Sequence, residues 1–225
     1  MKFLNALLIT VILTSATAFA AEKTSPVSKG TKAPVGLSKE ITAALNPESF
    51  QISVPDGPNL QVWFIKNLAA QPSFKPSLNV KYPFTPGQLI GAIQIAKGSN
   101  FSDFRAQEIP AGVYTLRYGQ QPEDGNHIGT SEIYDFLLAL PAKVDKSPLA
   151  INFADQLTSK SAESAGSSHP AIFSLLPAEK KIKKASLTHD ENHDFWIFNV
   201  ACPIKKGGKN AIVPLRVVVV GHAEE

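Results

Sequence analysis

The segment GVYTLRYGQQPEDGNHIGTSEIYDFLLALP, residues 112–141, contains two strand-like runs separated by a polar stretch. In the first run, residues 112–119, large apolar and aromatic side chains occupy alternate positions, which is the period of a β-strand. In the second run, residues 134–141, apolar residues are nearly continuous, which indicates a strand buried on both faces. The segment therefore predicts two strands joined by a turn.

The polar stretch PEDGNH, residues 122–127, has two interpretations. Asp124-Gly125 is a common turn pair and Asn126 tolerates left-handed backbone angles, so the stretch is first of all a turn. Its oxygen-bearing side chains lack the alternating spacing of a calcium loop. Asp124 and His127 nevertheless remain candidate metal ligands, and His169 is the third ligand expected to join them.

Outward from this segment, the chain continues as short strand-like runs between turn signals. Its 17 prolines punctuate the sequence throughout, and proline is excluded from helix interiors and central strands. We predict a mainly β fold, a single β-sandwich domain of prealbumin-like or immunoglobulin-like general architecture. One surface helix is expected within residues 147–166, with Ser147 as its cap, Pro148 in its first turn and Gly166 at its end.

The N-terminus predicts export. Lys2 precedes a short apolar run, and Ala18 and Ala20 stand at the −3 and −1 positions of a cleavage site, as in a secretory signal peptide. The apolar run is shorter than the roughly 20 residues of a membrane-spanning helix. We expect residues 1–20 to be the signal peptide, residues 21–48 a flexible segment and residues 49–225 the β-sandwich domain. The predicted location is secreted or periplasmic, with no transmembrane segment after cleavage.

Charge and cysteine content narrow the function classes. Removing Lys2 with the signal peptide leaves 21 Lys and Arg against 19 Asp and Glu, so the mature chain is almost neutral. Nucleic acid is therefore not expected as a partner, because it calls for a dense basic surface. Cys202 is the single cysteine, so the exported chain forms no internal disulfide, and its apolar neighbours indicate a buried, inert thiol.

A second candidate metal site lies at THDENH, residues 188–193. If Asp190 to Asn192 form a three-residue hairpin loop, His189 and His193 become a cross-strand pair with Cβ atoms roughly 4.5–5.5 Å apart. Two imidazoles fall short of the three or four protein ligands of a zinc site, so a plain polar turn is the competing interpretation.

Three motifs stand out together: a Gly-x-Tyr-Thr-Leu-Arg strand, a Gln-Pro-x-Asp-Gly-x-His-x-Gly-Thr loop and a later His-Pro-Ala stretch. In these motifs the sequence resembles a family of uncharacterised secreted proteins of planctomycete-type bacteria, whose loop reads Gln-Pro-x-Asp-Gly-Asp-His-x-Gly-Thr. The matching positions are Gly112, Tyr114 to Arg117, Gln121-Pro122, Asp124-Gly125, His127, Gly129-Thr130 and His169 to Ala171. Asn126 stands where the pattern often has a second Asp, which weakens any cation site that needs this charge. The resemblance implies export and a shared β-rich fold, and it implies no activity.

These observations predict an exported, non-catalytic binding or structural protein of the periplasm or cell surface. A cell-envelope protein or a glycan is the expected class of partner, and no catalytic or cofactor-binding residue is predicted. The alternative hypothesis is a metal carrier or metal-dependent oxidoreductase that binds a divalent transition metal. Its ligands would be Asp124, His127 and His169, with His189 and His193 as the second set.

Overall fold

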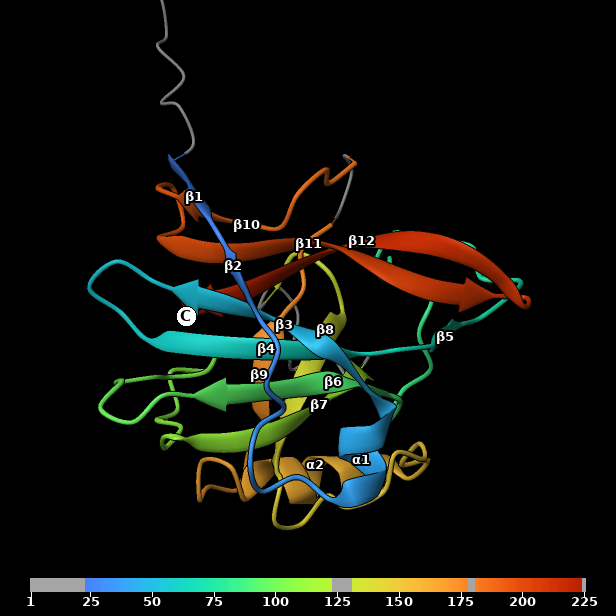
Figure 1. Ribbon diagram of the computed structural model, residues 1–225, viewed down its shortest axis with the longest axis horizontal. Coiled ribbons are helices and arrows are strands. Elements are labelled where there is room, and N and C mark those ends of the chain that lie inside the picture. Colours follow the sequence, from blue (N-terminus) through green and yellow to red (C-terminus); the bar gives the residue numbers. More distant parts are fainter. Residues whose placement is uncertain (1–22, 123–130, 178–180, 224–225) are drawn as a thin grey trace, which may run out of the picture.

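The computed structural model describes residues 23–122, 131–177 and 181–223, which form two β-sheets packed face to face and two helices (Figure 1). The first half of the chain holds β1 Lys23–Pro26, β2 Ser28–Gly30, α1 Lys39–Ala44, β3 Leu45–Ser53, β4 Asn59–Ile65, β5 Leu68–Ala70 and β6 Leu89–Ile95. The second half holds β7 Gly112–Gln120, β8 Asp135–Pro141, α2 Ala154–Ala162, β9 Ala171–Ser174, β10 Ser186–Asp190, β11 Phe195–Lys206 and β12 Lys209–Val220. The fold is thus mainly β, a single β-sandwich, as predicted.

The larger sheet has seven strands in the order β2-β3-β4-β6-β7-β8-β9. Residues 112–141 supply β7 and β8, which pair antiparallel from Tyr114–Pro141 to Gln120–Asp135. Both predicted strand runs are therefore confirmed, and they lie in the interior of this sheet rather than at its edge.

The smaller sheet has the order β1-β10-β11-β12, and β5 joins it parallel to the end of β11. β11 and β12 form a long hairpin that closes through Gly207 and Gly208, whose φ angles are 56° and 78°. A two-residue turn with positive φ at both positions favours glycine, so this pair fixes the register of the hairpin. In Figure 1 the smaller sheet lies across the top, above β3, β4, β6 and β7.

The core fills the space between the sheets with apolar and aromatic side chains. Phe64 of β4 and Phe198 of β11 stack across this space with ring centroids 6.5 Å apart. β8 is buried on both faces, as predicted: Leu137 faces the core between the sheets, while Leu138 packs against Leu157 of α2. Burial of such side chains is the main force that holds the two sheets together.

A second link between the sheets is a hydrogen-bonded tyrosine. The hydroxyl of the buried Tyr82 donates to the carbonyl oxygen of Leu176 at 2.8 Å and accepts the N–H of Arg216 at 3.2 Å. Beside it, Leu175 and Val217 form an isolated antiparallel bridge between the end of β9 and β12. The end of β9 is thereby fastened to one stretch of the β12 edge.

The N-terminal segment differs from the flexible lead-in predicted over residues 21–48. β1 pairs with β10 in the smaller sheet, β2 pairs with β3 in the larger sheet, and α1 begins at the cap residue Ser38. Both strands are short, and their Ser, Thr and Lys residues carry no apolar alternation. Leu37 and Leu45, on either side of α1, cluster with Trp63 and Ala92 of the larger sheet, and Ile41 within α1 is completely buried.

α2 is also shorter than the helix predicted within residues 147–166. It begins at Ala154, because the chain before it is held in an extended loop, and Ser147 accepts the N–H of Leu149 rather than capping a helix. Gly166 adopts a φ of 62° after the helix, in line with its predicted role at the end. No helix in the described ranges is long and apolar enough to cross a membrane.

Candidate functional site

A fully buried arginine lies at the base of a pocket between α2 and the chain that follows β8. Arg117 of β7 places its guanidinium beside Asp145, with Nε and Nη2 donating to the two carboxylate oxygens at 2.7 and 2.8 Å. Nη1 donates to the carbonyl oxygens of Gly87 and Leu149 at 2.8 Å each, and Nη2 also donates to that of Ser147 at 2.6 Å. All five N–H donors of the side chain are thus satisfied.

The arginine fixes the chain that follows β8. Asp145 accepts a further hydrogen bond from the hydroxyl of Thr115 at 2.5 Å, so its carboxylate is held on two sides. The carbonyl of Lys146 accepts from Ser38 at the start of α1 at 2.7 Å, and the N–H of Ile151 donates to Gly87 at 3.1 Å. Residues 145–151 therefore form a rigid loop although they contain no regular secondary structure.

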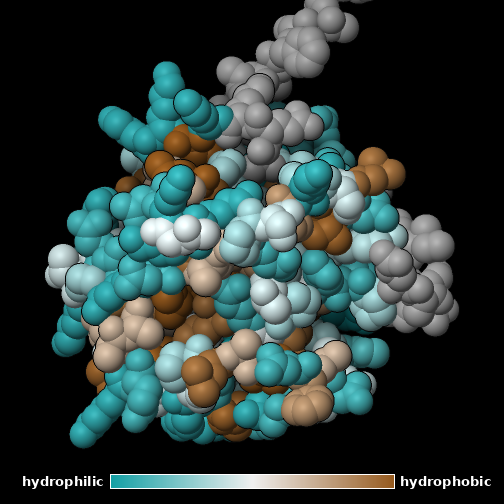
Figure 2. All heavy atoms as spheres, turned by 90° about the vertical axis from the view of Figure 1, so that its right-hand side faces the viewer, coloured by the Kyte–Doolittle hydropathy of each residue, from teal (hydrophilic) through white to brown (hydrophobic). Residues whose placement is uncertain are grey.

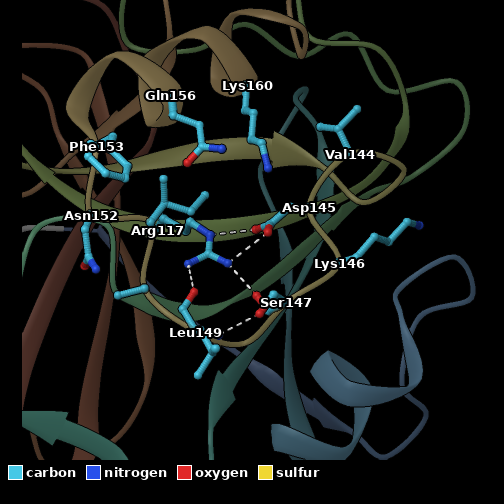
Figure 3. A pocket seen from close by; sticks show the side chains of 12 residues that line it. Arg117, Val144, Asp145, Lys146, Ser147, Leu149, Asn152, Phe153, Gln156 and Lys160 are labelled. Carbon is cyan, nitrogen blue, oxygen red and sulfur yellow. Dashed lines mark hydrogen bonds and ion pairs between the residues drawn. The ribbon is translucent and has the colours of Figure 1, made fainter.

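This loop and α2 line a cavity of about 340 Å³ that is open to solvent and lies above the ion pair (Figure 3). Gln156 and Lys160 point from α2 into the cavity, whereas Lys146 points away from it. Leu149 and Phe153, each 75% exposed, give the rim two apolar side chains. The lining consists of Arg117, Val144, Asp145, Lys146, Ser147, Leu149, Ala150, Ile151, Asn152, Phe153, Gln156 and Lys160.

The electrostatics of this cavity favour an anion. Asp145 is its one acidic lining residue among those described, and Arg117 offsets that charge at close range. Lys160 is then the positive charge directed into the space, and Gln156 offers both a donor and an acceptor beside it. The cavity can hold a small polar or anionic molecule against a rigid floor.

Two further buried carboxylates stabilise loops. Asp135 accepts the N–H groups of Lys81 and Tyr82 at 2.7 and 3.2 Å and the hydroxyl of Tyr118. Burial raises the pKa of Asp135 above its usual value, although these hydrogen bonds act in the opposite direction. Asp135 thus ties the segment before Phe84 to the ends of β7 and β8.

Asp103 plays the same part at the other end of the larger sheet. Its carboxylate accepts the N–H groups of Arg105 and Gln107 at 3.0 and 2.9 Å, which closes a tight local turn. It also accepts the N–H of Ile172 in β9 at 2.9 Å, across a long stretch of sequence. With Arg117, Asp145 and Asp135, each charged side chain in the buried part of the described structure is engaged in holding the fold.

The first predicted metal set is only partly described. Asp124 and His127 lie outside the described residues, so their approach to His169 stays a prediction. His169 is exposed in the loop before β9, where its N–H donates to the hydroxyl of Ser167 at 3.0 Å. The structure thus brings His169 to the surface, in an accessible loop.

The second predicted set has a different geometry from the one expected. The hairpin between β10 and β11 closes through four residues, 191–194, instead of the predicted three. As a result His189 lies opposite Trp196, stacked on it with ring centroids 4.5 Å apart, and His193 belongs to the turn itself. The prediction of a cross-strand histidine pair is therefore wrong.

Each of these histidines contacts its own aspartate. His189 Nε2 lies 2.8 Å from Asp194 Oδ1, and His193 Nδ1 lies 2.9 Å from Asp190 Oδ2. Two separate pairs replace one shared ligand set. Within residues 23–122, 131–177 and 181–223, no group of three or more His, Cys, Asp or Glu side chains is placed to hold a metal ion.

Cys202 is buried in β11, as predicted. Its side chain is 0% exposed, and burial raises the pKa of the Cys202 thiol to about 12. The thiol therefore stays protonated at neutral pH, and a protonated thiol is a poor nucleophile.

Arg117 and Asp145 were missed at the level of sequence. The available signal was the arginine inside the alternating run TLRY, since a charge in a buried strand requires a partner. Comparison of the chain with family models, with curated proteins and with solved structures found no match. The geometry of the site is therefore the basis for the functional proposal.

Proposed function

We propose that the chain is an exported, non-catalytic binding protein of the periplasm or cell surface. Its ligand is a small anionic molecule held in the cavity above Arg117 and Asp145. The observation that carries the proposal is the direction of Lys160, which points into the cavity over an ion pair that is already internally neutral. A ligand with a carboxylate would supply the missing counter-charge.

The state of the buried charges supports a binding role over a catalytic one. Catalytic acids and bases need an accessible proton and a pKa suited to the reaction. The hydrogen bonds of Arg117 and Asp145 are instead made to other groups of the protein, and both residues are almost completely buried. They form a rigid floor, which is what a pre-organised binding site requires.

The rim suggests the ligand's other groups. Phe153 exposes most of its ring beside the cavity, and Asn152 and Gln156 add amide groups around it. A flat apolar ring next to polar donors and acceptors suits a sugar ring, and Lys160 suits a carboxylate on that sugar. Uronic acids of envelope glycans combine both features.

We expect D-glucuronate and D-galacturonate to bind more tightly than glucose and galactose, measured by calorimetry on the mature chain. Lys160→Met removes the charge directed into the cavity and should weaken uronate binding at least about tenfold, or about 1.4 kcal/mol. Lys146→Met is the matched control, because this lysine lines the cavity but points away from it.

Equal binding of charged and neutral sugars would contradict the ligand class. Equal losses of uronate affinity in Lys160→Met and Lys146→Met would contradict the location of the binding site. Hydrolytic or redox turnover by the purified chain would contradict the non-catalytic role.

The metal hypothesis remains the alternative prediction. We expect protein purified without chelator to contain well below one transition-metal ion per chain in elemental analysis, since no three His, Cys, Asp or Glu side chains among the described residues are placed to share a metal ion. Near-stoichiometric metal that is lost in His127→Ala and kept in His189→Ala would reverse this expectation. It would place the site at Asp124, His127 and His169.

A further inference from the structure

An apolar groove lies on the opposite side of the fold from α2, along the free part of β12. It has a volume of about 360 Å³, and we call it the β12 groove. Its lining consists of Phe74, Pro76, Lys81, Tyr82, Pro83, Pro177, Ile204, Lys206, Ala211, Ile212, Val213 and Pro214. Figure 2 views the molecule from the side of β5 and the β11–β12 turn, where apolar surface shows between hydrophilic side chains.

The backbone of β12 is unpaired along this groove. Arg216 directs its N–H and C=O away from β11, to the Tyr82 hydroxyl and the Leu176 N–H. Because backbone direction repeats every second residue in an antiparallel strand, Pro214 and Ile212 face the same way. Ile212 lies opposite Pro203 of β11, which has no N–H. This agrees with a pair of residues that exchange no hydrogen bonds with each other.

Ile212 therefore presents one free donor and one free acceptor at an open sheet edge. In the described part of the chain, neither group has a hydrogen-bond partner. Its side chain is also 67% exposed beside them, which is unusual for a large apolar residue in a strand. Pro214, two residues later, has no N–H, so it limits how far another strand can pair with this edge.

The charges at the groove have one sign. Lys81 and Lys206 line it, and none of its described lining residues is acidic. Lys75 lies in sequence between the lining residues Phe74 and Pro76 and adds to the positive charge of this end. A partner of complementary charge is anionic.

We propose that the β12 groove binds an extended, acidic peptide segment of a partner protein. The backbone of the segment pairs with Ile212, its apolar side chains enter the groove and its carboxylates meet Lys81 and Lys206. This mode is the addition of a strand to an open sheet edge. The proposal is independent of the ligand cavity above Arg117.

Two other occupants fit less well. A lipid chain would fill the apolar lining but would leave the N–H and C=O of Ile212 unpaired, at a cost in free energy. A second copy paired through β12 about Ile212 would set Pro214 of each strand against Asn210 of the other. Because proline has no N–H, this pairing would lose the hydrogen bond that each of these positions would otherwise donate. It would also bring two positively charged grooves together.

The test is a selection of short random peptides displayed on phage, using the mature chain as bait. We expect the enriched peptides to carry apolar residues together with Asp or Glu, and their affinity to fall as salt rises. In the best enriched peptide, methylation of one backbone nitrogen should weaken binding at least about tenfold, because that nitrogen donates to Ile212.

Variants assign the binding to the groove. Ile212→Asp and Lys206→Glu should each weaken the binding of the enriched peptide at least about tenfold. Val35→Asp and Lys97→Glu are the matched controls, since both residues are exposed and neither lines the groove, and each should change affinity less than about twofold.

The proposal is overturned by any of four results. These are the absence of enriched peptides, enrichment of cationic peptides, equal losses in the control variants, and insensitivity to every backbone methylation. A dimer in light scattering that Ile212→Asp converts to a monomer would identify a second copy as the occupant instead. Binding to phosphatidylglycerol vesicles, lost in the same variant, would identify a lipid surface.

Discussion

Arg117→Leu is expected to lower the free energy of unfolding by about 3–5 kcal/mol. The substitution leaves the Asp145 carboxylate buried without its counter-charge. It also removes the donor to the carbonyl oxygens of Leu149 and Ser147, and the Gly87 carbonyl keeps only the N–H of Ile151. Urea unfolding followed by tryptophan fluorescence gives the measurement.

The control is an ion pair of similar length on the surface. Lys29 and Glu48 lie 2.7 Å apart, with side chains 62% and 55% exposed. Glu48→Gln should cost below about 1 kcal/mol, because solvent screens an exposed pair. If Arg117→Leu gives no soluble protein, Arg117→Lys provides a second measurement, since it keeps the charge but loses the bidentate fork. A cost of Arg117→Lys below about 1 kcal/mol would contradict the structural role of the guanidinium.

Gly87→Ala is expected to cost at least about 2 kcal/mol more than Gly98→Ala. Both glycines have left-handed φ angles, 80° and 78°, so an alanine is strained to the same degree at either position. A Cβ at Gly87 would lie 1.8 Å from the carbonyl oxygen of Ile151, whereas nothing lies within 4 Å of one at Gly98. The difference between the two variants therefore measures the contact with the loop.

The same pair of variants links stability to the ligand cavity. Gly87 holds Ile151 through a backbone hydrogen bond, and this residue is part of the cavity lining. Hydrogen exchange of residues 145–151 should be faster in Gly87→Ala and unchanged in Gly98→Ala. Equal costs in unfolding, or equal exchange, would show that the close approach at Gly87 is relieved without disturbing the loop.

The sequence carried enough information for the architecture because local patterns determine it. Alternation in β7 and the continuous apolar run in β8 predicted two strands and the burial of β8 on both faces, and both predictions are confirmed. β1 and β2 were missed because their pairing partners, not their own residues, make them strands. Edge strands with exposed polar side chains have little local signal.

The candidate site could not be predicted, since it depends on contacts between distant residues. Arg117 and Asp145 meet only after β7 and β8 pair and the chain turns back beneath α2. The prediction of a cross-strand histidine pair was wrong because the turn has one more residue than expected, which moves His193 out of the strand register. Residue types alone set neither a long-range contact nor the length of a turn.

The pairing of β1 has a consequence for the order in which the molecule can assemble. Lys23 pairs with His189, so β1, one of the first strands to be made, can pair only after β10, one of the last, has been made. Until β10 has been made, this pairing cannot form and the smaller sheet is incomplete. Contacts this far apart in sequence form slowly, and open edges are sites of aggregation during that time. Completion of this sheet must therefore follow synthesis of nearly the whole chain.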